Sequence, residues 1–240
     1  MAFSFFKERN DPARASMLAR AFDYPYAQPK EPLLFHAGQA FFLPKARMIA
    51  HERLVDVEGV GLCAPVLASG SNAAVSVLKR KFGSHPVTIL QGPVVLSRGS
   101  LRHSAHISKY GSIPATYVCD NYVISREHHK LLRVTLQLVP LEALPRLDAS
   151  EAIGVNYERV RIEQRIKPWW LPVRLDGFWV YRSLHGPLKP DGKPVSLGPQ
   201  KRVLALVAGR MNWTDSLEAF IVRMVRDDDY RKTVTQALKA

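Results

Sequence analysis

The stretch LCAPVLASGSNAAVSVLKRKF, residues 62–82, decides how this chain can be interpreted. Its first part, residues 62–68, is a short apolar run that favours a buried strand, and Pro65 favours an edge position or a bulge for it. The polar residues 69–72 break the run. Apolar side chains at helical spacing follow in residues 73–82. The sequence therefore predicts a strand, a tight polar loop and a helix in that order.

The loop between this strand and helix carries Gly70, Ser71 and Asn72. Backbone N–H groups at the start of a helix lack intrahelical partners, and the helix dipole adds partial positive charge there. A carboxylate, a phosphate or a developing oxyanion is stabilised in such a place. The alternative is an ordinary turn in which the short polar side chains cap the helix, and the local pattern alone favours that alternative.

A second segment of interest ends in Leu-Asp-Ala-Ser-Glu, with the glutamate at position 151. Residues 141–150 are expected to form one or two helical turns, with Leu141, Leu144 and Leu147 facing a core. Asp148 and Glu151 then lie near the helix end. A carboxyl group held against an apolar wall can act as a general acid or base. A glutamate facing solvent is the alternative, and local pattern favours it.

Taken together, the two segments resemble the gamma-glutamylcyclotransferase superfamily. That family has a strand ending in Tyr-Gly-Ser-Asn and a helix with a downstream Leu and Arg, which residues 66–72, Leu78 and Arg80 match here. Far downstream it has Leu-Asp-x-x-Glu-Gly and then a Tyr that opens a strand, which residues 147–152 and Tyr157 match. The resemblance covers roughly residues 62–166, and two positions depart from the pattern: Ser69 stands in place of Tyr and Ala152 in place of Gly.

The resemblance implies an α+β fold, namely a small mixed β-barrel with flanking helices. It implies an enzyme, of the transferase or lyase kind, that cyclises a γ-glutamyl amide to 5-oxoproline and releases a free amine without a metal or cofactor. Glu151 would be the general acid/base. The substrate-binding residues would be Ser69, Gly70, Ser71, Asn72 and Tyr157. A module on the same fold that binds a small anion without chemistry is the alternative.

A polar run, residues 102–112, lies between β-prone segments. If it faces the cavity, Arg102 can bind a substrate carboxylate, and His106 and Tyr110 can donate hydrogen bonds. A solvated loop is the equal alternative. His103 and His106 have a spacing that a metal could use on a helix, but no acidic third ligand is near, so no metal site is predicted.

The composition bounds these interpretations. The chain has 240 residues, 47% hydrophobic residues and a net charge of +13, so it can bury a sizeable core. Its basic residues are scattered, which favours solvated faces over a nucleic-acid surface and leaves a basic nucleic-acid-binding protein as a lesser alternative. The expected partner is a small amide or amino-acid-derived substrate, and the oligomeric state is left open.

Two cysteines without a CxxC motif and the absence of an apolar run of ~20 residues predict a cytoplasmic protein with no membrane segment. We expect residues 1–60 to be an N-terminal extension packed on the core, residues 61–210 to be the gamma-glutamylcyclotransferase-like domain, and residues 211–240 to be C-terminal helices. Residues 97–116 are expected to be a loop. Further strands are expected at 35–43, 55–60, 87–90, 94–96, 117–124, 131–139, 155–166, 178–183 and 203–207, and helices at 214–225 and 230–238.

Overall fold

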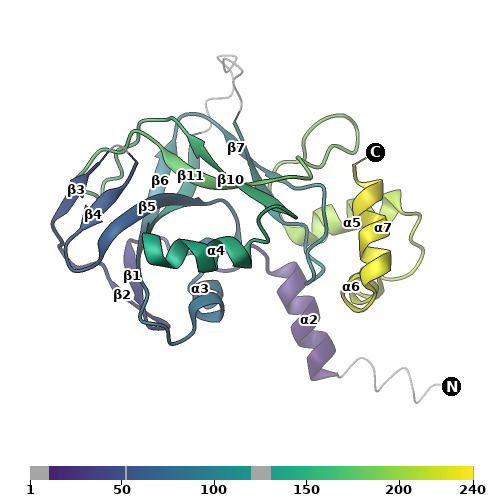
Figure 1. Cartoon of the computed structure of the whole chain (residues 1–240). Helices are drawn as coiled ribbons and strands as arrows, with labels where there is room; N and C mark the ends of the chain where they lie inside the picture. The colour runs from purple at the N-terminus through teal and green to yellow at the C-terminus, as the bar shows by residue number, and fades with distance from the viewer. Residues whose placement is uncertain (1–10, 52, 120–130, 240) are drawn as a thin grey trace. The chain divides into compact units, whose positions relative to one another are not determined.

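The computed structural model describes residues 11–51, 53–119 and 131–239 (Figure 1). The chain divides into two compact units that alternate along the sequence. The described residues of unit 1 are 11–25, 102–115 and 185–239, and unit 2 takes up Tyr26–Leu101 and Thr116–Leu184. Each unit has buried hydrophobic clusters of its own, and each is described by itself.

Unit 2 is built on a sheet to which nine strands of the described residues contribute. They are β1 (Leu33–His36), β2 (Gln39–Phe42), β3 (Met48–Ala50), β4 (Val55–Val57), β5 (Gly61–Ala68), β6 (Thr88–Leu96), β9 (Leu132–Pro140), β10 (Tyr157–Ile162) and β11 (Phe178–Ser183). The pairing order is β10-β11-β5-β9-β6-β1-β2, with β4 between β3 and β5. β11 and β5 run parallel and the other pairs are antiparallel. The predicted mixed α+β class is confirmed. The described strands do not close into the predicted barrel, because β10 and β2 stand at the two ends of an open path.

β5, the strand predicted from residues 62–68, lies inside this sheet and not at its edge. One side of β5 pairs with β9. The other side is shared, because β4 pairs with β5 as far as Cys63 and β11 pairs with it at Val66 and Leu67. Pro65 falls between these two partners, where neither is in register. A residue without a backbone N–H is tolerated at such a position, so the edge predicted from the proline exists only locally.

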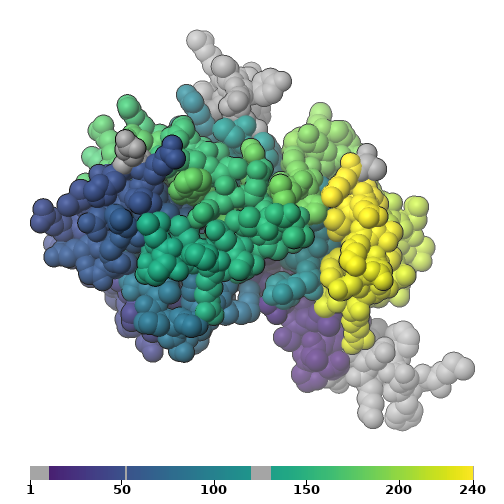
Figure 2. All heavy atoms as spheres, viewed as in Figure 1, coloured from purple at the N-terminus to yellow at the C-terminus, as the bar shows by residue number. Residues whose placement is uncertain are grey.

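Both faces of the sheet are covered, which explains why β5 is a continuous apolar run and not an alternating one. Val66 belongs to the cluster beneath the helices α3 (Val75–Phe82) and α4 (Leu144–Ser150), whereas Leu67 belongs to the cluster on the opposite face. Leu78 and Phe82 of α3 and Leu147 of α4 are fully buried in the first cluster. Side chains of α3 and α4 lie next to one another at the surface of unit 2 (Figure 2).

Unit 1 is mainly helical. Its helices are α2 (Pro12–Phe22), α5 (Gln200–Arg210), α6 (Leu217–Arg226) and α7 (Asp228–Ala237). The predicted helices at 214–225 and 230–238 correspond to α6 and α7. The strand predicted at 203–207 is wrong, because this segment lies within α5. Val203, Leu204, Val207 and Ala208 form the buried face of that helix, so the valines follow the helical period.

β7 (Ser100–His103) and β8 (Ala115–Val118) pair with each other in a separate sheet of two strands. The predicted loop at 97–116 therefore contains one strand and the start of another. The strand predicted at 117–124 begins in β8 and then runs outside the described residues. Within the described part of the chain, no helix combines the length and apolar character needed to cross a membrane.

Candidate functional site

The polar loop after β5 folds into a 3-10 turn, η1 (Ser71–Ala73), before α3 begins. Neither η1 nor α3 has a side-chain cap. The alternative of an ordinary capped turn is therefore not what the structure shows. The N–H groups at the start of the turn are not used by a capping side chain, and the side chain of Asn72 is directed elsewhere.

Three glutamine side chains hold this turn by its carbonyl groups. Two of them, from β6 and β9, are fully buried beneath the turn and also contact each other, with Gln137 Nε2 2.7 Å from Gln91 Oε1. Because the carbonyl groups are occupied, the turn is fixed against the sheet. The three hydrogen bonds are Gln28 Nε2 to Gly70 O (3.0 Å), Gln91 Nε2 to Ala73 O (2.9 Å) and Gln137 Nε2 to Asn72 O (3.0 Å).

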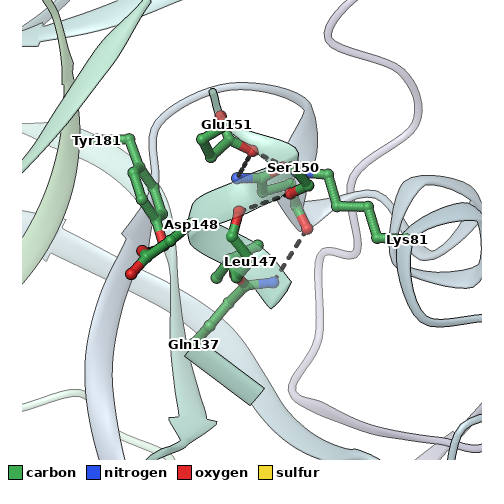
Figure 3. A network of polar contacts seen from close by, with 8 residues as sticks. Lys81, Gln137, Leu147, Asp148, Ser150, Glu151 and Tyr181 are labelled. Atoms are coloured by element: carbon green, nitrogen blue, oxygen red, sulfur yellow. Dashed lines mark hydrogen bonds and ion pairs between the residues drawn. The ribbon is translucent and has the colours of Figure 1, made fainter. Parts of the chain in front are cut away.

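Glu151 lies beside this turn although 79 residues separate it from Asn72. Glu151 is the C-cap residue of α4, which is anchored by the buried Leu144 and Leu147, as the sequence predicted. The prediction that Leu141 also faces a core is wrong, because Leu141 precedes α4 and is exposed. The Asn72 side chain donates from Nδ2 to Glu151 Oε1 at 3.0 Å. Lys81, from the last turn of α3, donates to Asn72 Oδ1 at 2.6 Å. The Lys81 ammonium also forms an ion pair with Glu151 Oε1 (Figure 3). We call Asn72, Lys81 and Glu151 the Glu151 cluster.

The surroundings of the Glu151 carboxylate differ from those of a solvent-facing glutamate. Its side chain and that of Lys81 are each 14% exposed. Both contacts to the carboxylate fall on Oε1, and within the described residues no donor reaches Oε2. The cluster thus has one carboxylate oxygen that is held by two donors and one that is without a hydrogen bond from the described residues.

A second polar group lies on the other side of the α4 end (Figure 3). Tyr181 donates its hydroxyl to Asp148 Oδ1 at 2.7 Å, and Arg159 Nη2 is 3.5 Å from Asp148 Oδ2. Burial, then the hydrogen bond to Asp148, and then the negative charges of Asp148 and Glu151 raise the pKa of Tyr181, so the phenol stays protonated and donates. These contacts fix the helix end that carries Glu151.

Ser69 and Tyr157, two further residues of the predicted site, are buried. Ser69 donates its backbone N–H to Leu67 O at 3.1 Å. Tyr157 opens β10, as predicted, and its ring belongs to the hydrophobic cluster under α3 and α4. Ala152, where the resembled family has Gly, has a φ of 52°, in the left-handed region that favours glycine.

Arg102, His106 and Tyr110 belong to unit 1, and each has contacts inside that unit. Arg102 donates to Ser196 Oγ, His106 Nδ1 lies 2.7 Å from Ser104 Oγ, and the Arg20 guanidinium lies over the Tyr110 ring. The His106 ring is also stacked on that of His185. Burial, with the charges of His185 and Lys239, lowers the pKa of His106 to about 3.

Sequence reasoning missed Lys81, Gln91, Gln137 and Tyr181 as parts of the site. One signal was available: each glutamine is flanked by apolar residues in a largely apolar strand, and a polar residue buried in such a strand needs a partner. Across residues 11–51, 53–119 and 131–239, no group of three or more His, Cys, Asp or Glu side chains is arranged to hold a metal ion.

Comparison of the chain with protein-family models, with curated proteins and with solved structures found no match.

Proposed function

We propose that this chain is an enzyme of the gamma-glutamylcyclotransferase kind, which converts a γ-glutamyl amide to 5-oxoproline and a free amine. One observation carries the proposal: Asn72, from the first motif of the resemblance, donates a hydrogen bond to Glu151, from the second. A chance similarity of two short motifs gives no reason for their key side chains to meet across the fold.

The proposed reaction is an intramolecular acyl transfer. The α-amine of the substrate attacks the γ-carbonyl carbon, a five-membered ring forms, and the bond from that carbon to the amide nitrogen breaks. Intramolecular attack gains from proximity. The amine must first lose a proton, and the open Oε2 of Glu151 is a suitable acceptor. The attacking nitrogen loses a second proton when the ring closes. The carboxyl group passes one proton to the leaving nitrogen and the other completes the departing ammonium, so no proton is gained or lost overall.

The turn before α3 supplies the second element of the proposed chemistry. Negative charge develops on the γ-carbonyl oxygen in the tetrahedral intermediate, and preorganised N–H groups stabilise such an oxyanion. The three glutamine contacts hold the carbonyl side of the turn, so its N–H groups need no reorganisation during the reaction. In this proposal the sheet of unit 2 is an opened relative of the family barrel.

The deciding experiment is the substitution Glu151→Gln. A panel of γ-glutamyl amides is incubated with the protein, and 5-oxoproline and free amine are quantified. Because Gln cannot accept the proton, we expect turnover to fall roughly 10²- to 10⁴-fold. Glu142→Gln is the matched control, since Glu142 is an exposed glutamate just before α4, and it should leave turnover unchanged.

Equal turnover by Glu151→Gln and the unsubstituted protein would refute the proposed role of Glu151. Binding of the γ-glutamyl amides without release of 5-oxoproline would instead support the alternative of a small-anion-binding module.

A further inference from the structure

Lys81 is a cation at the centre of the candidate site, and the family resemblance assigns no role to it. Its ammonium contacts Asn72 Oδ1 and Glu151 Oε1, and among the described residues Glu151 is the one carboxylate within ion-pair distance of it. Lys81 and Glu151 are largely but not completely shielded, each being 14% exposed. Part of each side chain is therefore in contact with solvent, and their charges are screened only partly.

Positive charge is in excess around this pair. Lys79 and Arg80 are exposed in the same helical turn as Lys81. Arg146 of α4 donates from Nε to the Lys81 carbonyl oxygen at 2.8 Å, which brings a further guanidinium to the end of α3. A local excess of cations raises the concentration of anions near the surface and favours an anionic ligand.

We propose that Lys81 binds the α-carboxylate of the substrate. This carboxylate replaces Glu151 as the ion-pair partner of the Lys81 ammonium, while Asn72 keeps its contact with the same ammonium. The identity of the substrate as an α-amino-acid derivative rests on the proposed function. The contact between Lys81 and Glu151 places one positive and one negative group side by side. An α-amino acid carries a carboxylate and an ammonium on one carbon, so its charges are complementary to the pair.

This exchange connects binding with proton transfer. When the α-carboxylate occupies Lys81, the α-amine on the same carbon is brought to Glu151, which has lost the ammonium as its partner. The released carboxylate then takes the proton of the amine, which makes the amine a nucleophile.

The experiment measures equilibrium binding of two small lactams by titration calorimetry. The probes are 5-oxoproline, which carries the carboxylate, and 2-pyrrolidone, which has the same ring without it. Lys81→Met keeps the length of the side chain and removes the charge, Lys81→Arg keeps the charge, and Lys79→Met is the control in the same helix. Circular dichroism and thermal unfolding establish that each variant is folded.

We expect the unsubstituted protein and Lys79→Met to bind 5-oxoproline and to prefer it to 2-pyrrolidone. Lys81→Met should bind 5-oxoproline roughly 10- to 100-fold more weakly, the range that a charge-assisted hydrogen bond is worth. Lys81→Arg should retain most of the affinity. Glu151→Gln should bind 5-oxoproline severalfold more tightly, because the competing carboxylate is gone.

Unchanged affinity of Lys81→Met for 5-oxoproline would overturn the inference, and so would equal binding of the two lactams by the unsubstituted protein. If Lys81→Met does not fold, weaker binding by Glu151→Gln would overturn it, because the exchange requires tighter binding. These readouts do not depend on turnover. A protein that binds 5-oxoproline through Lys81 but releases none from γ-glutamyl amides would refute the proposed function and retain this inference.

Discussion

Each unit buries a polar cluster, and the two clusters differ in kind. In unit 2, Lys81 and Glu151 are charged and meet at a single carboxylate oxygen. In unit 1, His103 and Gln200 are neutral and both bind Ile113, with Gln200 Oε1 accepting from its N–H and Gln200 Nε2 donating to its carbonyl, each at 2.8 Å. In the unit 1 cluster both ring nitrogens of His103 and both polar atoms of the Gln200 amide have hydrogen-bond partners. In the Glu151 cluster the Oε2 atom has no such partner among the described residues.

This difference separates a structural role from a functional one. The ring of His103 illustrates the first case. Its Nε2 accepts from the Gly198 N–H at 3.1 Å, so the proton is on Nδ1, which donates to Ile113 O. Burial lowers the pKa of His103, in keeping with a neutral ring. Such a cluster holds segments together and has no group to offer a ligand, so its loss should affect stability and not turnover.

The largest effect that tests this comparison is expected for Gln200→Leu. The substitution leaves the Ile113 N–H without its acceptor and the Ile113 carbonyl with one hydrogen bond fewer, in a fully buried position. We expect the free energy of unfolding to fall by about 3 kcal/mol, with turnover per folded molecule unchanged. Chemical denaturation measures the first quantity. The control is Gln236→Leu, an exposed position in α7, and a loss of turnover in folded Gln200→Leu would contradict the assigned role.

A smaller effect is expected from acid. The unfolded His106 takes up a proton near its ordinary pKa of 6.5, whereas in the folded chain its pKa is lowered to about 3. The unfolded state therefore binds more protons between these values, and the contribution to stability is complete above pH 6.5 and lost as the pH falls. At pH 5 the loss from His106 should be about 2 kcal/mol.

The measurement compares the unfolding free energies of the unsubstituted chain and of His106→Asn at pH 7.5 and pH 5. The variant should lose less stability on acidification, because it lacks the buried imidazole near His185 and Lys239. Parallel losses in the two proteins would show that His106 does not carry the effect.

The smallest effect concerns the residue after Glu151. Ala152 adopts a φ of 52°, where a side chain is unfavourable. Ala152→Gly should raise the free energy of unfolding by about 0.5–1 kcal/mol, since relief of the left-handed conformation outweighs the added freedom of the unfolded chain. Asn212→Gly is the matched control, because Asn212 has a similar φ of 51° and asparagine tolerates this region better. Lower stability of Ala152→Gly would contradict the expectation.

The part of the site that the sequence predicted is the part encoded locally. Residues 62–82 showed a strand, a turn and a helix because apolar spacing changes from continuous to helical there. Leu144 and Leu147 placed Glu151 at a helix end for the same reason. The family resemblance only assigned the two motifs to one site, and the hydrogen bond between Asn72 and Glu151 was not predicted, since neither residue by itself contains information about a partner 79 residues away.

The remaining features depend on tertiary contacts. Lys81 looked like part of a solvated basic run, because its counter-ion comes from another helix. The segment 203–207 was misassigned because its valines favour strands, whereas packing of one helical face decides the outcome. The open sheet could also not be predicted from the sequence, because its strand order is fixed by pairings between segments far apart in sequence.

The alternation of the two units along the chain has a consequence for synthesis on the ribosome. α2 contacts α5 and α6, which are translated only after all of unit 2 has been made. β5 likewise pairs with β11 along part of its second edge, and this pairing forms only after β11 has been synthesised. We therefore expect the nascent chain to expose the apolar side of α2 while unit 2 is being synthesised, so that unit 1 completes its folding after unit 2.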